Sequence, residues 1–205
     1  MDKEKINKLM SALEKNKISA VFVETADDAK AYVLKSIPQN TSVGIGGSMT
    51  VYNMNLHHEI SDKGNPVHWH WLETTPEKRA EAIEKANRAD VYLTSTNAIT
   101  MQGEIVNIDG NGNRVTAMIH GPKKVMILCG INKITDNLIT AVDRVKNQAC
   151  PPNAKRLNRK TPCAVTGDCS DCRSEDRMCS VTTIIHQKPG LIDMEVVLIG
   201  ENLGY

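Results

Sequence analysis

The sequence predicts an α/β fold built on an open, mainly parallel, doubly wound sheet. Two observations lead to this prediction. Apolar residues alternate between helical and strand-like spacing along the chain, and the expected strands are separated by helices, as parallel strands require. With 205 residues, 40% of them hydrophobic, the chain is long enough for one sizeable core and too short for two. We therefore expect a single domain over residues 1–205 with a cysteine-rich insert at 150–180 before the last strands.

In the first half of the chain, strand and helix patterns alternate. Ile6, Leu9 and Leu13 fall at helical spacing near the N-terminus. Thr75 is placed to cap a later helix, with Pro76 at its first position. The expected helices after the first lie at 26–37, 48–60 and 75–89. The expected strands lie at 18–24, 41–47, 66–71 and 89–96.

The second half is expected to begin with a hairpin over 103–115, because its Asp-Gly and Asn-Gly pairs supply positive φ angles. A buried strand at 124–130 and a helix at 135–150 follow. Residues 151–180 show little periodicity, and a connection of that length in a compact domain is normally functional or disordered. The chain then returns to the sheet with strands at 181–187 and 193–205.

Composition restricts the class of function. The formal charge is +1, and only four Tyr, two Trp and one Phe are present, so a nucleic-acid partner is not expected. The first twenty residues are charged and lack a signal-peptide core, and no stretch is apolar enough to cross a bilayer. We expect a cytoplasmic protein without a membrane partner, in which clustered cysteines hold a metal more often than they form disulfides.

The cysteine cluster is the most specific motif. Cys163, Cys169, Cys172 and Cys179 follow the spacing C-x5-C-x2-C-x6-C, and the central C-x2-C can turn two thiolates toward one ion. Cys150 is an alternative fourth ligand. We expect an iron–sulfur cluster or zinc, which the outer spacings do not distinguish. The remaining interpretations are a redox-labile Cys169 and Cys172 pair or solvent-facing thiols on a loop.

A glycine turn is the second motif. The segment SVGIGGSMT resembles neither a dinucleotide fingerprint nor a P-loop. Its glycines allow close approach of a ligand, and the following residues would present free N–H groups to a carboxylate or phosphate. The alternative is a plain strand-to-helix turn. The candidate ligand-binding residues are Gly44, Gly46, Gly47, Ser48, Met49 and Thr50.

Several segments together resemble the lactate-utilisation (LUD) domain family. They are GIGGSMT, TSTNAITMQGEIVNIDGNGNRV, HGPKKVMILCGINKI and VKNQACPPNA. The resemblance covers roughly residues 5–155 and the final strands. It implies the fold of sugar-phosphate isomerases and CoA transferases, with a ligand cleft beside the glycine turn. The cysteine insert is similar to that of the family's cysteine-bearing, stand-alone branch.

Further candidate residues are expected at the edge of the sheet where the glycine turn lies. Glu104 is the candidate catalytic carboxylate, because the CoA transferases that the family resembles use a glutamate and because it follows a glycine near a strand start. A solvated glutamate before a hairpin is the plainer reading of Glu104. Asn97, Thr100, Gly103 and Lys133 are candidate ligand-binding residues, with turn formation the alternative for Asn97 and simple exposure for Lys133.

Two functions from different classes follow. In the first, the protein takes part in metabolism, binds a small anionic metabolite at the glycine turn and carries a metal or iron–sulfur centre. The metabolite is lactate or another hydroxy or keto acid, with a sugar phosphate or a CoA derivative as alternatives. In the second, it is a non-catalytic subunit or redox sensor with a structural zinc site. The resemblance implies a protein partner in lactate oxidation, and a homo-oligomer is compatible with the sequence.

Overall fold

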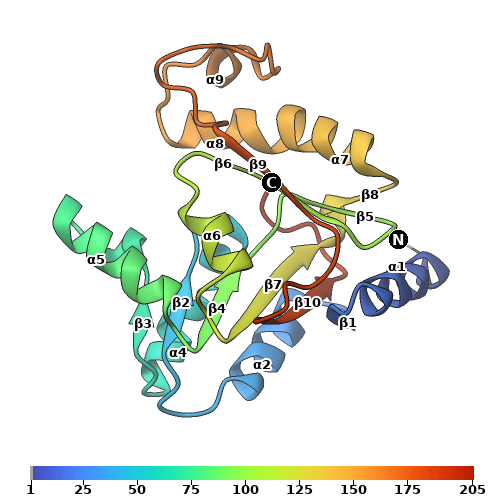
Figure 1. Ribbon diagram of the computed structural model, residues 1–205, viewed down its shortest axis with the longest axis vertical. Helices are drawn as coiled ribbons and strands as arrows, with labels where there is room; N and C mark the ends of the chain where they lie inside the picture. Colours follow the sequence, from blue (N-terminus) through green and yellow to red (C-terminus); the bar gives the residue numbers. More distant parts are fainter. Residues whose placement is uncertain (1) are drawn as a thin grey trace.

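The computed structural model describes residues 2–205 and contains two β-sheets with helices packed around them (Figure 1). In the larger sheet every neighbouring pair of strands is parallel. Its six strands, in spatial order, are β1 (Ser19–Val23), β10 (Asp193–Ile199), β7 (Lys124–Gly130), β4 (Val91–Thr94), β2 (Val43–Ile45) and β3 (Val67–His68). This arrangement confirms the predicted open, mainly parallel α/β sheet.

Three helices cover one face of the larger sheet. They are α2 (Ala26–Ser36), α3 (Met49–Asn53) and α4 (Leu56–Asp62). Helix α2 begins with a capping box, in which the Thr25 hydroxyl accepts the N–H of Asp28 and the Asp28 carboxylate accepts the N–H of Thr25. The apolar side chains of these helices pack on Met126 and Leu128 of β7 and share one buried cluster with them.

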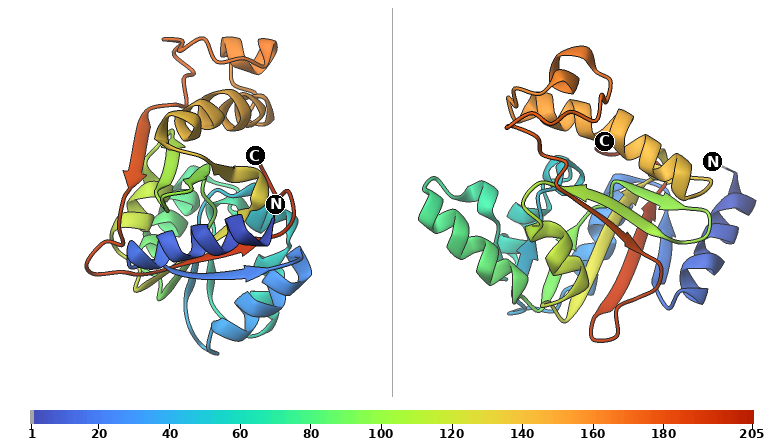
Figure 2. Two further views of the ribbon diagram at one scale, coloured as in Figure 1. Left: turned by 90° about the vertical axis from the view of Figure 1, so that its right-hand side faces the viewer. Right: turned by 45° about the horizontal axis from the view of Figure 1, so that its top comes forward.

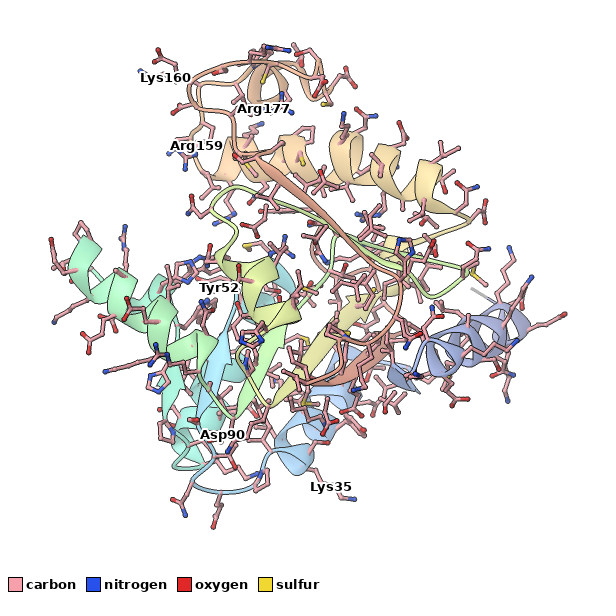
Figure 3. The ribbon with its side chains drawn as sticks, in the orientation of Figure 1. Lys35, Tyr52, Asp90, Arg159, Lys160 and Arg177 are labelled. Atoms are coloured by element: carbon pink, nitrogen blue, oxygen red, sulfur yellow. The ribbon has the colours of Figure 1, made fainter. Side chains whose placement is uncertain are left out.

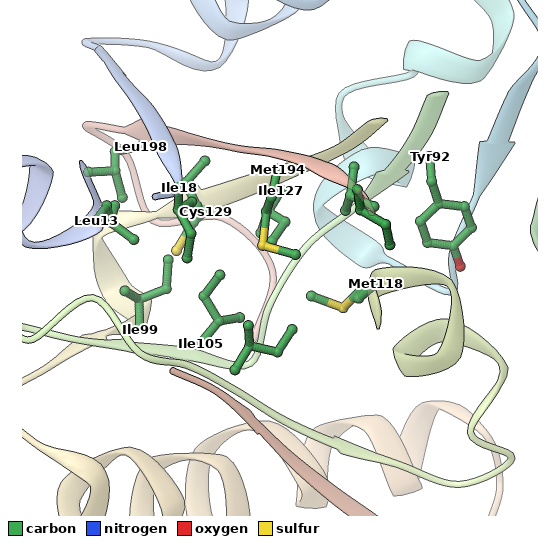
Figure 4. Close-up of a cluster of buried hydrophobic side chains, with 14 of the residues drawn as sticks. Leu13, Ile18, Tyr92, Ile99, Ile105, Met118, Ile127, Cys129, Met194 and Leu198 are labelled. Atoms are coloured by element: carbon green, nitrogen blue, oxygen red, sulfur yellow. The ribbon is translucent and has the colours of Figure 1, made fainter. Parts of the chain in front are cut away.

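The opposite face of the larger sheet buries a second apolar cluster (Figure 4). Val125, Ile127 and Cys129 of β7 point into this second cluster, whereas Met126 and Leu128 point to the first face. Successive residues of a strand point to opposite faces of the sheet, so this alternation is expected. The helices on this side are α1 (Lys3–Lys15), α5 (Pro76–Asn87) and α6 (Asn113–Ile119). Ile99 and Ile105 of the second sheet close the cluster.

The second sheet corrects the hairpin prediction. Its four strands, in spatial order, are β8 (Ile134–Thr135), β5 (Ala98–Thr100), β6 (Ile105–Asp109) and β9 (Val181–Ile185). The hairpin joins β5 to β6 through a turn with Gly103 at φ +80°, so the hairpin expected at 103–115 is wrong. The Asp109 carboxylate accepts the N–H groups of Asn111 and Gly112, and the chain enters α6 there instead of a returning strand.

Two further predicted elements differ from the structure. The helix expected at 48–60 is two helices, because Asn55 adopts a left-handed φ of 55° between α3 and α4. The strand expected at 66–71 ends after His68, and a 3₁₀ turn, η1 (His70–Leu72), follows. Trp69 is 1% exposed and packs in the first apolar cluster.

A long helical rod lies across the second sheet. It consists of α7 (Leu138–Arg144), a π-helical turn η3 (Val145–Ala149) and α8 (Cys150–Arg156), and it therefore runs beyond the helix predicted at 135–150. Pro151 and Pro152 have no N–H to donate, so the regular α-helical ladder is interrupted where they enter the rod. Beyond α8, the cysteine-rich segment contains one short helix, α9 (Pro162–Thr166), and packs against the rod (Figure 2).

The order of the strands creates a switch point between β2 and β4. The chain leaves β2 through α3 and α4 on one face and moves outward to β3. It leaves β4 through the second sheet and α6 on the other face and moves inward to β7. Connections that leave neighbouring strands toward opposite faces open a crevice at the carboxyl ends of those strands, where open α/β sheets bind ligands.

The packing of β2 against α5 yields a testable prediction. A Cβ atom on Gly44 would lie 2.4 Å from the backbone oxygen of Ala86 in α5. Gly44→Ala should therefore lower the free energy of unfolding by about 1–3 kcal/mol, the usual cost of overpacking. Gly190→Ala is the matched control, because its Cβ would meet no atom within 4 Å, and its effect should stay below about 0.5 kcal/mol. Urea unfolding measures both; equal stabilities of the two variants would contradict the assignment.

Candidate functional site

A cavity of about 230 Å³ lies at the β2–β4 switch point. Three groups of residues line it. Gly47, Met49, Thr50, Ser95 and Lys133 come from the carboxyl ends of the strands. Asn97, Asp109 and Arg114 come from the second sheet and α6. His70, Trp71, Cys150, Arg156 and Tyr205 close the side toward the helical rod and the cysteine-rich segment.

Three adjacent parallel strands bring three polar side chains to one point in this cavity. Thr50 follows β2, Ser95 follows β4, and Lys133 ends the 3₁₀ turn η2 (Ile131–Lys133) after β7. The Lys133 Nζ donates to Ser95 Oγ at 2.9 Å and to Thr50 Oγ1 at 3.1 Å. Parallel strands direct their carboxyl ends to one edge of the sheet, so the topology itself produces this convergence.

Lys133 is 2% exposed and faces no acidic side chain within residues 2–205 that would pair with it. Burial lowers the pKa of its ammonium from 10.5 to about 8. Arg144 and Arg114 push the pKa in the same direction by repulsion, and the thiol of Cys129 opposes them. A buried cation without a counter-charge in a cavity is the arrangement expected of a group that awaits an anion or works as a neutral amine.

Arg114, in contrast, is fully occupied by protein partners. Its guanidinium donates to the Asp109 carboxylate at 3.1 Å, to the Asn107 amide oxygen at 2.6 Å and to the Asn97 amide oxygen at 3.1 Å. It also donates to the backbone oxygen of Ser95. Asn97 lies in the cavity wall, and its amide oxygen is engaged within the wall; its contact with a ligand stays a prediction. Arg114 therefore makes the wall rigid without offering a free donor, and the Asp109 carboxylate offsets its charge.

An aromatic and basic wall faces the strand ends. The Arg156 guanidinium lies over the Trp71 ring at 4.8 Å and donates to the Tyr205 hydroxyl at 2.7 Å and to the Asn153 amide oxygen. The Tyr205 hydroxyl donates to the same Asn153 oxygen. Burial raises the pKa of Tyr205, so it stays a neutral donor at this wall.

The glycine turn divides into packing and lining residues. A Cβ atom on Gly46 would lie 2.7 Å from the Tyr92 hydroxyl, as one on Gly44 would meet α5, so both glycines serve the close packing of β2. Gly47 lines the cavity opposite Trp71. The Ser48 hydroxyl accepts the Val51 N–H and caps α3. Contact of these residues with a ligand stays a prediction.

Glu104, Thr100 and Gly103 lie away from the cavity. They belong to the β5–β6 turn, at the opposite end of β6 from Asp109, and none of them lines the cavity. The Glu104 carboxylate accepts a hydrogen bond from Thr100 Oγ1 at 3.0 Å and lies 3.0 Å from His186 Nδ1. The structure therefore does not bring the predicted catalytic carboxylate together with the glycine turn, because β5 and β6 form a separate sheet.

Among the predicted metal-ligating thiols, Cys150 and Cys179 contact each other, and Cys163 and Cys169 lie within electrostatic reach of Cys150. Cys150 lies at the start of α8, is 5% exposed and contacts Cys179. The Cys150 thiol donates to Cys179, which lowers the pKa of Cys179 to about 7 and raises that of Cys150. Cys163 and Cys169 are near enough to raise the pKa of Cys150 further by repulsion.

Polar contacts tie the cysteine-rich segment to the helical rod. The N–H of Cys169 donates to the Asn147 amide oxygen at 3.2 Å. Asp171 pairs with Arg177 at 3.1 Å and with Lys146 of η3 at 3.5 Å, while Arg177 also donates to the backbone oxygen of Cys172. Arg177 and other basic residues of the segment gather at this end of the molecule, opposite Asp90 at the start of β4 (Figure 3). Positive charge beside thiols favours thiolates.

Two features are absent from residues 2–205. The His, Cys, Asp and Glu side chains there form no group of three or more at the separation that holds a metal ion. No helix in the same part of the chain has the length and apolar content needed to span a bilayer. The metal centre therefore stays a prediction.

Sequence reasoning missed several cavity residues. Ser95 had a usable signal, since TST ends a buried strand and the carboxyl ends of such strands carry function in α/β sheets. Arg114, Trp71 and Tyr205 had none, because they reach the cavity from segments whose position depends on the second sheet and the end of the chain.

Comparison with known proteins places the chain among LUD domains. A family model described as the LUD domain matches residues 6–199. Among solved structures, the crystal structure of a DUF162 family protein from Deinococcus radiodurans is similar, with a TM-score of 0.56 and 12% identity over 96% of each chain. At this identity the likeness concerns the fold alone. No curated protein matches the chain.

The buried amine should be detectable in the pH dependence of stability. Because the pKa of Lys133 falls from 10.5 in the unfolded chain to about 8 in the folded one, the unfolded state binds more protons in that window and stability rises with pH there. Lys133→Met removes this dependence. The free energy of unfolding of Lys133→Met, minus that of the wild type, should be largest below pH 8. This difference should fall by about 3 kcal/mol between pH 8 and pH 10.5, because the wild type gains stability as Lys133 loses its proton. Urea unfolding over this range is the measurement, and a constant difference would refute the burial argument.

Proposed function

Because the chain belongs to the LUD domain family, we propose that it is a metabolic protein that binds a small carboxylate in the switch-point cavity. The substrate class is the hydroxy or keto acids, of which lactate is the member that the family's association suggests. The observation that carries the proposal is the buried, uncompensated Lys133 at the junction of three strand ends. A carboxylate there would supply the missing counter-charge.

The cavity suits a small ligand with one anionic end. Its volume of about 230 Å³ is below the range of sites for drug-sized molecules, which begins near about 300 Å³. Hydroxyl groups of Thr50 and Ser95 stand beside Lys133 and can hydrogen-bond a hydroxy or keto oxygen. Trp71 and Arg156 form the opposite wall. The polar end and the aromatic wall would together orient a short acid.

The second part of the proposal is a metal centre held by Cys150, Cys163, Cys169 and Cys179. This set is supported by the contact of Cys150 with Cys179 and by the proximity of the other two thiols to Cys150. Cys172 is the neighbouring alternative. An iron–sulfur cluster would supply electron transfer beside the carboxylate, whereas zinc would hold the segment on the helical rod.

The position of Cys150 favours a link between the two sites. Cys150 belongs to the thiol group and also lines the cavity. A centre bound there would lie in the wall of the carboxylate site. A protein partner that exchanges electrons with this wall and self-association of the chain are compatible with the proposal and stay predictions.

Carboxylate binding can be tested through Lys133. We expect L-lactate or pyruvate to raise the melting temperature of the wild-type protein, because a ligand that binds the folded state stabilises it. Lys133→Met should weaken binding at least about tenfold, since a hydrogen bond to a charged group contributes about 1.5–3 kcal/mol. Isothermal titration calorimetry measures the loss. Lys85→Met, on the exposed face of α5, is the control and should bind as the wild type does. Equal binding by both variants would exclude Lys133.

The metal centre can be tested by composition. Protein purified without oxygen should contain iron with acid-labile sulfide, or zinc, and Cys150→Ser should lose most of it because one ligand is removed. Cys129→Ala is the matched control, since Cys129 lies in the apolar core and belongs to no thiol group. Elemental analysis and the visible spectrum report the result. Metal-free wild-type protein, or full occupancy in Cys150→Ser, would contradict the ligand set.

A further inference from the structure

We propose that Lys133 is a nucleophilic amine that forms an imine with the carbonyl carbon of a 2-oxo acid bound in the cavity. This inference rests on the carboxylate site proposed above and deepens it, because it names the reacting atom and restricts the substrate to acids with a neighbouring carbonyl. Lys133 would then form a covalent bond to the substrate in addition to attracting its carboxylate.

The first argument is the position of the amine. Lys133 Nζ lies at the junction of three strand ends and lines the cavity, although the side chain is only 2% exposed. Two short hydroxyl contacts, to Ser95 at 2.9 Å and Thr50 at 3.1 Å, hold the long side chain in one place. A fixed amine reacts with a bound carbonyl without first losing conformational freedom, which is a large part of the barrier in such reactions.

The second argument is the balance of charges around the amine. Arg144 from α7 and Arg114 from α6 both repel the ammonium. The Asp109 carboxylate pairs with Arg114, and no acidic side chain of the described residues pairs with Lys133 itself. The neutral thiol of Cys129 in β7 is the other titratable group that faces it. Burial and the two cations lower the pKa of Lys133 to about 8. A lysine made neutral by desolvation beside other cations is a known way to activate an amine.

The same charges suit the substrate. Arg144, for which no acidic partner is found among the described residues, makes the potential at Nζ more positive, and this potential favours a carboxylate next to the carbonyl that the amine attacks. Neighbouring cations that lower the pKa of Lys133 would not help an amine whose sole role is to neutralise a carboxylate, because that role requires the protonated form.

The reaction balances without any further reagent. The Nζ lone pair forms a bond to the carbonyl carbon, and the carbonyl oxygen takes a proton to give a carbinolamine. The C–O bond then breaks, and the hydroxyl leaves as water with a second proton from the nitrogen. Ser95 Oγ, which contacts Nζ, is placed to relay these protons. The product is an imine, which in its protonated form withdraws electrons from the adjacent carbon.

The test is reductive trapping. The wild-type protein is incubated separately with pyruvate, 2-oxoglutarate and L-lactate in the presence of sodium cyanoborohydride, and its intact mass and peptide map are measured. We expect one reduced adduct per chain, on Lys133, with at least one of the two 2-oxo acids. Lactate has no keto group and should give none. Lys133→Arg keeps a positive charge but cannot form the imine, and it should lose the adduct completely.

The outcomes separate this inference from the function on which it rests. Thermal stabilisation by the 2-oxo acids without an adduct on Lys133 overturns the imine and leaves the carboxylate site intact. If the 2-oxo acids give no thermal stabilisation and no adduct forms, both the imine and the carboxylate site are overturned. Adducts spread over surface lysines, equal in the wild type and Lys133→Arg, also overturn the inference. Because the wild-type peptide map locates the adduct by itself, the result does not depend on the folding of the variant.

Discussion

The desolvation of one ammonium group is the constraint around which the site is organised. Lys133 is buried at the ends of β2, β4 and β7 without a negative partner, which costs folding free energy unless the amine loses its proton or gains an anion. The hydroxyls of Thr50 and Ser95 satisfy its hydrogen-bonding capacity without neutralising it. Arg114 and its ring of oxygen acceptors fix the wall beside it. The cavity exists because these groups converge where the strand order reverses.

The parallel sheet was predictable because its rules are local. Helices and strands alternate in the sequence, and β7 carries the near-continuous apolar pattern of a strand covered on both faces. The second sheet was not predictable in the same way, since β6 pairs with β9 and β5 with β8 through residues far apart in sequence, such as Val106 with Ile184 and Ile99 with Ile134. The Asp-Gly and Asn-Gly pairs give the same turn signal whether a strand or a helix follows, and here a helix follows.

The candidate site was predicted in part for the same reason. Gly47, Thr50, Asn97 and Lys133 line the cavity because each follows a strand of the predicted topology. Glu104 does not, because its position depends on the second sheet. Of the cysteines, the sequence spacing pointed to the late cluster and left Cys150 as an alternative. The approach of Cys150 to Cys179 depends on how the segment folds back on the helical rod, which spacing does not determine.

The π-helical turn η3 gives the thiol group its orientation. Successive side chains of an α-helix are about 100° apart around the helix axis. The wider π-helical turn at Val145–Ala149 changes this spacing, so the side chains of α8 point in other directions than they would in a continuous α-helix. Arg144, before the wide turn, faces the strand ends, while Cys150 and Arg156, after it, face the cavity wall and the late cysteines. One helix thereby addresses two chemical environments. The π-helical turn changes the direction in which the side chains of α8 point, relative to those of α7, compared with an uninterrupted α-helix of the same length.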